Sequence, residues 1–123
     1  MLKRENRLTK NNDFDAVFKK GKSCYSKILF IKSLPNSLKE NRFGILVGTK
    51  ISKKAVIRNK IKRQIRAAIE SELFLLNKGN DCVIVVFPLI LANKFDEIET
   101  ALKFCFKKLR LYKKTQFTCL IKY

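Results

Sequence analysis

The clearest pattern of apolar and polar residues lies in the middle of the chain. Four apolar residues recur there at the spacing of one stripe of an α-helix: Ile57, Ile61, Ile65 and Ala68. This spacing predicts a helix from about Lys54 to Leu76, ended by turn residues 78–81. At about 100° per residue, the opposite face of the helix carries Asn59, Lys62, Arg63 and Arg66.

Two shorter segments also have helical spacing. The first begins at Asn11 or Asn12, either of which can serve as the N-cap, and ends at Gly21. The apolar residues on one face of this helix are Phe14, Val17 and Phe18. The second begins with Asn93 as its N-cap. Its apolar stripe consists of Phe95, Ile98, Leu102, Cys105 and Leu109.

Three apolar segments predict β-strands. Ile28–Leu34 and Phe43–Lys50 are separated by polar turn residues, so we expect them to form an antiparallel hairpin. Cys82–Phe87 is apolar throughout, which is typical of a central strand buried on both faces. The tail Thr115–Tyr123 alternates only weakly and fits either an edge strand or an extension. The elements predict a single α+β domain over residues 1–123, with helices packed on a sheet in the order α-β-β-α-β-α.

The charge balance changes this picture by indicating a partner. The chain has 28 Lys and Arg residues against 10 Asp and Glu residues, which gives a formal net charge of +18. Such a chain repels itself unless a polyanion neutralises it, so nucleic acid is the leading class of partner. An anionic membrane surface fits less well, because the basic residues are spread through the fold instead of forming one amphipathic anchor.

The residues available for catalysis exclude most protein-based mechanisms. The chain has no histidine, so it lacks an imidazole base and a Cys/His zinc site. Its four cysteines are far apart, and we expect Cys82 and Cys105 to be buried and reduced. No side-chain cofactor or metal site is expected. The N-terminus lacks the apolar segment of a signal peptide, and the longest apolar run is too short to span a bilayer. We therefore expect a cytoplasmic protein.

The central helix has the strongest functional signal. Eight of the seventeen residues from Lys50 to Arg66 are Lys or Arg, and none is Asp or Glu. Cations at the start of a helix oppose its dipole, which indicates that they are placed for a ligand and not for folding. A solvated charged face is the alternative, although such faces normally mix signs. The candidate RNA-binding residues are Lys53, Lys54, Arg58, Asn59, Lys60, Lys62, Arg63 and Arg66.

The aromatic face of the first helix is a second candidate surface. Phe14 and Phe18 have the spacing of core residues, and core packing explains them fully. Phenyl rings also stack unpaired bases in proteins that bind single strands. The spacing alone leaves both interpretations open.

Residues 55–66 resemble the signature helix of the protein component of bacterial ribonuclease P, which has the form Ala-Val-x-Arg-Asn-x-x-Lys-Arg-x-x-Arg. The resemblance extends over nearly the whole chain. Leu2 to Leu8 and Asp13 to Gly21 match the family's opening segment, and Gly44 to Lys50 matches the strand before the signature. Lys60 departs from the pattern, because the family usually has a second Arg there; the charge is kept but a bidentate contact to phosphate is lost.

The resemblance implies a partner, a substrate and a topology. The partner would be a large catalytic RNA that removes the 5′ leader of precursor tRNA and holds the Mg²⁺ ions, most simply in a 1:1 complex. The sheet would be a small mixed one of about four strands with a left-handed crossover around the signature helix. The residues implied to bind the leader are Arg7, Phe14, Phe18 and Lys32. Composition alone also fits a basic structural RNA-binding protein such as a ribosomal component.

Overall fold

The structure is a computed structural model, and it describes residues 3–92 and 94–113. The helices are α1 (Asn11–Lys20), α2 (Ala55–Glu72) and α3 (Phe95–Lys108), with short 3₁₀ segments η1 (Arg4–Asn6), η2 (Leu73–Leu75) and η3 (Pro88–Ala92). The strands are β1 (Lys22–Tyr25), β2 (Leu29–Pro35), β3 (Arg42–Leu46) and β4 (Asn80–Val86). The predicted α+β class and element order are confirmed, and β1 is an additional strand.

The four strands form one mixed sheet in the order β1-β2-β4-β3. Strand β4 pairs antiparallel with β2 and parallel with β3, so that Ile84 lies between Ile31 and Ile45. The predicted hairpin of β2 with β3 is therefore wrong. The reason is burial: β4 is the most apolar strand and takes the central position, where both of its faces are covered. Strand β2 forms its hairpin with β1 instead.

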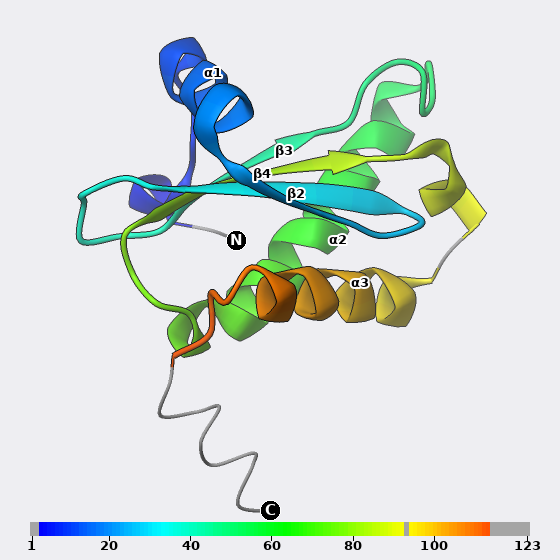
Figure 1. The fold of residues 1–123 in the computed structure, drawn as a ribbon. Helices are drawn as coiled ribbons and strands as arrows, with labels where there is room; N and C mark the ends of the chain where they lie inside the picture. The colour runs from blue at the N-terminus through cyan, green and yellow to red at the C-terminus, as the bar shows by residue number, and fades with distance from the viewer. Residues whose placement is uncertain (1–2, 93, 114–123) are drawn as a thin grey trace, which may run out of the picture.

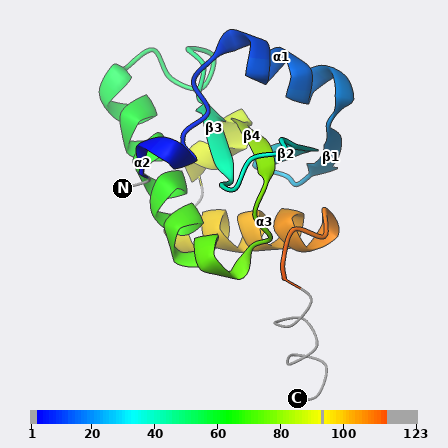
Figure 2. The ribbon, with the colours of Figure 1, turned by 90° about the vertical axis from the view of Figure 1, so that its left-hand side faces the viewer.

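Helices cover both faces of the sheet (Figures 1 and 2). Helices α2 and α3 pack on one face, and α1 lies on the other. Alternate residues of each strand supply the two cores: Ile31 and Ile84 contribute to the large core under α2 and α3, and Val83 contributes to the small core under α1. This three-layer packing leaves part of the sheet face on which α1 lies without a helix above it (Figure 1).

Strands β3 and β4 are parallel neighbours joined through α2, which is the crossover unit that the resemblance implies. Helix α2 ends at Glu72, and the predicted remainder of the helix is the 3₁₀ segment η2. The left-handed sense of the crossover stays a prediction of the resemblance.

The helix starts differ from the predicted caps. Lys10 is the N-cap of α1, and Asn11 is already helical. Lys94 is the N-cap of α3, where its backbone N–H donates to Glu97 Oε1 at 3.3 Å. Asn93, the cap expected from sequence, lies outside the described residues, as do Cys119 and the tail Thr115–Tyr123. Neither α1 nor α2 has a side-chain hydrogen bond at its N-cap, because both begin after a lysine.

The predicted state of the buried cysteines is confirmed. Cys82 and Cys105 are buried free thiols, and burial raises the pKa of each to about 12. Both therefore stay protonated at neutral pH and pack as small apolar side chains. Within the described ranges, no helix is both long and apolar enough to cross a membrane.

Candidate RNA interfaces

Helix α2 has the two faces that its spacing predicts. Ile61 and Ile65 are buried in the large core at 5% and 0% exposure. On the other side, Asn59 and Arg63 are exposed, whereas Lys62 and Arg66 are half-buried. Half-burial is the usual state of long cationic side chains, because their methylene stems pack on the helix while their charged ends reach water.

The first turn of α2 extends this surface toward the helix start. Lys53, Lys54 and Lys60 are all exposed, and the first turn contains no acidic residue. We call the eight predicted RNA-binding residues, all of which belong to this region, the α2 face: Lys53, Lys54, Arg58, Asn59, Lys60, Lys62, Arg63 and Arg66. Since the helix dipole disfavours cations here, folding alone does not account for their position.

Arg58 differs from the other cations of the α2 face. Its guanidinium donates a hydrogen bond from Nη1 to the carbonyl oxygen of Ser52 at 2.9 Å, and the side chain is half-buried. The Ser52 hydroxyl in turn accepts a hydrogen bond from the backbone N–H of Lys54 at 3.2 Å. Arg58 therefore joins the loop before α2 to the helix, in addition to carrying charge.

Four carboxylates form ion pairs with cations outside the α2 face. Arg42 binds Asp81 at 2.6 Å and Asp13 at 3.2 Å, while Lys103 binds Glu99 at 3.0 Å and Glu72 at 3.4 Å. Among residues 3–92 and 94–113, no residue of the α2 face forms an ion pair. The charge of this face is therefore available to an anionic ligand.

The second predicted surface lies where α1 meets the sheet. The ring of Phe14 lies so close to the backbone at Gly44 that a Cβ there would overlap it. Phe14 and Phe18 are half-buried and pack on the small core around Val17 and Val83. The core contacts of both rings are confirmed, and each ring stays partly accessible, so base stacking on them stays a prediction.

Lys32 is placed beside Phe18, as the resemblance implies. Its ammonium donates a hydrogen bond to the carbonyl oxygen of Phe18 at 3.0 Å and lies 5.8 Å from the centroid of the Phe18 ring. Lys32 thereby joins β2 to the C-terminal half of α1 and keeps a positive charge next to an aromatic ring.

Arg7, the fourth residue of the predicted leader-binding set, is exposed and lies beside β3, where it forms an isolated bridge with Phe43. The neighbouring residue Leu8 is buried in the small core, and its backbone N–H donates to the carbonyl oxygen of Phe43 at 2.9 Å. Arg7 is thus held at the β3 edge of the sheet, and Lys32 lies on β2.

The sequence did not predict the sheet residues next to this surface. Phe30, Val85 and Leu46 lie in one row across β2, β4 and β3, on the face that α1 occupies. Phe30 and Val85 are half-buried, and Leu46 is 38% exposed. Because side chains alternate between the two faces of a sheet, the sequence predicts which residues of one strand share a face. It does not predict this row, which exists only because β4 lies between β2 and β3. We call Phe14, Phe18, Lys32 and this row the aromatic surface.

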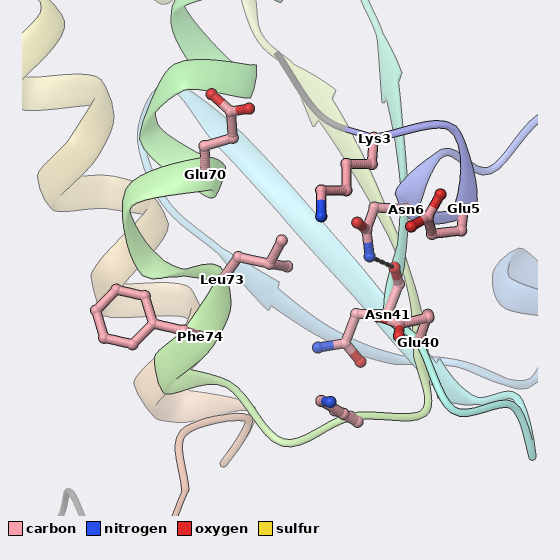
Figure 3. A pocket seen from close by; sticks show the side chains of 9 residues that line it. Lys3, Glu5, Asn6, Glu40, Asn41, Glu70, Leu73 and Phe74 are labelled. Atoms are coloured by element: carbon pink, nitrogen blue, oxygen red, sulfur yellow. Dashed lines mark hydrogen bonds between the residues drawn. The ribbon is translucent and has the colours of Figure 1, made fainter.

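A pocket of about 380 Å³ lies elsewhere, between η1, the loop before β3 and the C-terminal end of α2 (Figure 3). It is lined by Lys3, Glu5, Asn6, Glu40, Asn41, Glu70, Leu73, Phe74 and Lys78. Three carboxylates and two ammonium groups share it, so it has none of the one-signed charge of the α2 face. It contains no predicted site residue. Within the described part of the chain, no group of three or more Cys, Asp or Glu side chains is arranged to hold a metal ion.

A small α+β domain belongs to the class of basic nucleic-acid-binding proteins when it combines a cationic helix face, free of ion pairs within the described residues, with an aromatic surface on the opposite face of its sheet. Residues 2–110 match the family model described as Ribonuclease P. The chain therefore belongs to the ribonuclease P protein family.

Individual relatives agree with this assignment. A ribonuclease P protein component from Bacillus velezensis is 38% identical over 115 residues, which cover 93% of this chain and 97% of the relative. The solved structure of the Staphylococcus aureus ribonuclease P protein matches with a TM-score of 0.81 at 27% identity, covering 88% of this chain and 98% of that one. The ribonuclease P protein from Thermotoga maritima matches with a TM-score of 0.75 at 28% identity, covering 83% and 96%. These matches favour this family over a ribosomal component.

Proposed function

We propose that this member of the ribonuclease P protein family binds two RNA ligands on two surfaces. As its family indicates, the chain is the protein subunit of the ribonucleoprotein that removes the 5′ leader of precursor tRNA. The α2 face docks on the catalytic RNA subunit, and the aromatic surface receives the single-stranded leader. The RNA subunit supplies the catalytic groups and the Mg²⁺ ions, in a complex with one copy of each subunit.

One observation supports the first assignment above all: the cations of the α2 face have no carboxylate partner among the described residues. Arg guanidinium groups bind phosphate through a planar fork, and Lys ammonium groups bind it as point charges. A continuous row of both on a rigid helix fits a folded RNA whose phosphates have fixed positions. The absence of acidic residues from the first turn of α2 also avoids repulsion of that ligand.

The second assignment is supported by the chemistry of the aromatic surface. Unpaired bases stack on phenyl rings, and a nearby ammonium group attracts the phosphates that connect them. Phe14, Phe18 and Lys32 offer both groups within one contiguous area of the sheet and α1. Paired RNA has no free base faces, so this surface suits a single strand better than a duplex.

Cleavage of precursor tRNA at low Mg²⁺ concentration tests the function directly. The RNA subunit is assayed with and without the protein. We expect the protein to raise cleavage strongly under these conditions, because it neutralises phosphates and holds the leader. Equal rates in the two reactions would contradict the proposed function.

Salt dependence tests the electrostatic part of the proposal separately. Five or six phosphate contacts predict a slope of log affinity against log salt of about −4 to −5, at roughly −0.7 to −0.9 per contact. The measurement is a titration of the RNA subunit with the protein at several salt concentrations. A flat salt response would contradict the assignment of the α2 face.

A further inference from the structure

Three aromatic side chains form a cluster at one end of the aromatic surface. Tyr25 on β1 stacks on Phe30 of β2, with ring centroids 5.0 Å apart and planes inclined by 26°. Phe87, which follows β4, also lies next to Phe30, with ring centroids 5.5 Å apart and planes inclined by 36°. We call Tyr25, Phe30 and Phe87 the aromatic platform. No pattern in the sequence indicates a function for Tyr25 or Phe87.

The platform lies on the same face of the sheet as α1. Leu29 and Ile31 are buried in the large core on the opposite face, so Phe30 between them points toward the α1 side. Tyr25 is the register partner of Phe30 on β1 and shares its face. Lys32 is two residues further along β2, about 7 Å along the strand. The platform therefore continues the surface formed by Phe18 and Lys32.

Core packing does not fully bury the rings of the platform. Tyr25 is 61% exposed, and Phe30 and Phe87 are half-buried. Tyr25 packs on Phe30 with one side of its ring, which leaves the other side to solvent. An exposed aromatic ring supported by two further rings is the arrangement on which an unpaired base stacks.

Charge decides from which side a nucleic acid approaches Tyr25. Tyr25 also borders a groove toward α3, which Lys27, Asp96 and Glu97 line together with Phe104. Two carboxylates against one ammonium group leave this groove with a net negative charge, which disfavours phosphate. On the other side, Lys32 provides a positive charge next to Phe18. An RNA strand therefore reaches the platform along the sheet from Lys32, and not through the α3 groove.

We propose that the aromatic platform stacks an unpaired base of the 5′ leader, adjacent to the part of the leader that Phe14 and Phe18 contact. This inference rests on the proposed function, because it assumes that the leader occupies the aromatic surface. It adds a second contact to the leader, made by β1, β2 and the residue after β4. The holoenzyme thus distinguishes leaders that are long enough to reach Tyr25 from shorter ones.

The test uses the holoenzyme reconstituted from the RNA subunit and the protein, with precursor tRNAs whose leaders are shortened one nucleotide at a time. Tyr25→Ala and Tyr25→Leu should weaken binding of long-leader substrates by about fivefold or more, the lower end of what one base–aromatic stack contributes. Binding of the shortest leaders should not change. Tyr25→Phe keeps the ring and should bind like the unmodified protein. Because Tyr25 is exposed, thermal stability should stay nearly constant in all three variants.

Abasic substitution in the leader locates the contact. One abasic position should weaken binding by the unmodified holoenzyme and have no further effect with Tyr25→Ala, because both changes remove the same interaction. The same coupling should appear with Phe87→Leu if the three rings act together.

Three outcomes would overturn the inference, and they are distinguishable. If leader length affects the unmodified holoenzyme but Tyr25→Ala responds identically, the platform does not contact the leader and the proposed function still holds. If leader length has no effect on the unmodified holoenzyme, leader binding by the proposed function fails as well. If Tyr25→Ala instead weakens binding of the RNA subunit alone, the platform belongs to the interface between the subunits.

Discussion

The α2 face and the aromatic surface differ in how closely they are tied to folding. The cations of the α2 face lie on or just before one helix, and apart from Arg58 none has a side-chain hydrogen bond or ion pair within the described residues. The aromatic surface is built from α1, β2, β3 and β4, and its rings also pack on the small core. Apart from Arg58, changes in the first surface should therefore affect binding alone, whereas changes in the second should affect binding and stability together.

The two surfaces also differ in what holds them in place. Helix α2 is anchored by a stripe of buried isoleucines on its far side, independently of the residues that carry the charge. Helix α1 is anchored by the very rings that are proposed to contact RNA, with further support from Arg42. That guanidinium joins Asp13 of α1 to Asp81 of β4, and its hydrogen bonds to Asp81 raise the pKa of Arg42. A rigid scaffold with separate ligand groups tolerates substitution better than a surface whose ligand groups are also its supports.

The largest effect is expected from removing charge on the α2 face. The triple substitution of Lys62, Arg63 and Arg66 by Ala should weaken binding of the RNA subunit roughly a thousandfold at low salt, at about 1.5 kcal/mol per charge-assisted hydrogen bond. The salt slope should become shallower by about two to three. The free energy of unfolding should change by less than about 1 kcal/mol, because these side chains lie on the outer face of α2. RNA titration and chemical denaturation measure the two effects.

The matched control removes the same charge elsewhere. Lys107, Lys108 and Lys113 are exposed at and beyond the end of α3, away from both surfaces. Their substitution by Ala should leave the affinity within a few fold of the original. An equal loss of affinity in the control would mean that net charge matters and that the α2 face does not.

Phe18→Ala should show the mixed behaviour of the aromatic surface. A fully buried phenylalanine costs about 3–5 kcal/mol when truncated, and the half-buried Phe18 should cost about 2–3 kcal/mol. Leader affinity should fall as well, which was one of the two alternatives left open by the sequence. Chemical denaturation and binding of a leader-containing substrate are measured on the same preparation.

Val17→Ala is the control for this variant, because the neighbouring Val17 is fully buried in the same small core and has no accessible side. It should lower stability without lowering the leader affinity of the folded protein. If Phe18→Ala and Val17→Ala bind the leader equally well, the Phe18 ring is only a core residue.

Gly44→Ala should disturb the aromatic surface without removing any of its side chains. A Cβ at Gly44 overlaps the Phe14 ring, so the ring must move, at a cost of about 1–3 kcal/mol. In the double variant Gly44→Ala, Phe14→Leu, the smaller leucine side chain should recover part of the lost stability, because the two residues are in contact. Thermal denaturation of the single and double variants measures the coupling.

Gly48→Ala is the matched control, since nothing lies within 4 Å of a Cβ added at Gly48. It should leave stability unchanged or slightly raised. A loss at Gly48 equal to that at Gly44 would show that backbone freedom, and not the Phe14 contact, explains both glycines.

The smallest effect separates two arginines of the α2 face. Arg58→Ala removes the hydrogen bond to the carbonyl oxygen of Ser52 and should lower the free energy of unfolding by about 0.5–1.5 kcal/mol. Arg63→Ala, on the exposed face, should change it by less than about 0.5 kcal/mol. Both should weaken assembly with the RNA subunit. Equal stability of the two variants, measured by denaturation, would show that Arg58 has no structural role.

Much of the α2 face could be predicted because its determinants are local. The spacing of Ile57, Ile61 and Ile65 defines the buried stripe of any helix, and the position of Arg63 on the far side follows from the same geometry. The structure leaves this prediction intact, with Ile61 and Ile65 buried and Arg63 exposed. Only the hydrogen bond of Arg58 to Ser52 was not evident, because it depends on the path of the loop before the helix.

Less of the aromatic surface could be predicted because its determinants are distant in sequence. The short strand β1 has too few apolar residues for a clear pattern. The pairing of Tyr25 with Phe30 on the neighbouring strand was therefore not predicted. Phe30 and Leu46 were each recognisable as strand residues. Their common row required knowing that β4 separates β2 from β3. The close contact between Phe14 and Gly44 likewise joins two segments that no periodicity relates.

Residue types and their spacing along the chain are enough to establish the α+β class, the amphipathic helix and the one-signed charge of the α2 face. Each of these depends on residue types and on spacings within one element, where the backbone geometry is fixed. The neighbours of each strand, and the rings that gather beside α1, depend instead on how the whole chain packs. Strands compete for buried positions over the whole chain, and the apolar strand β4 obtained the centre because both of its faces exclude water there.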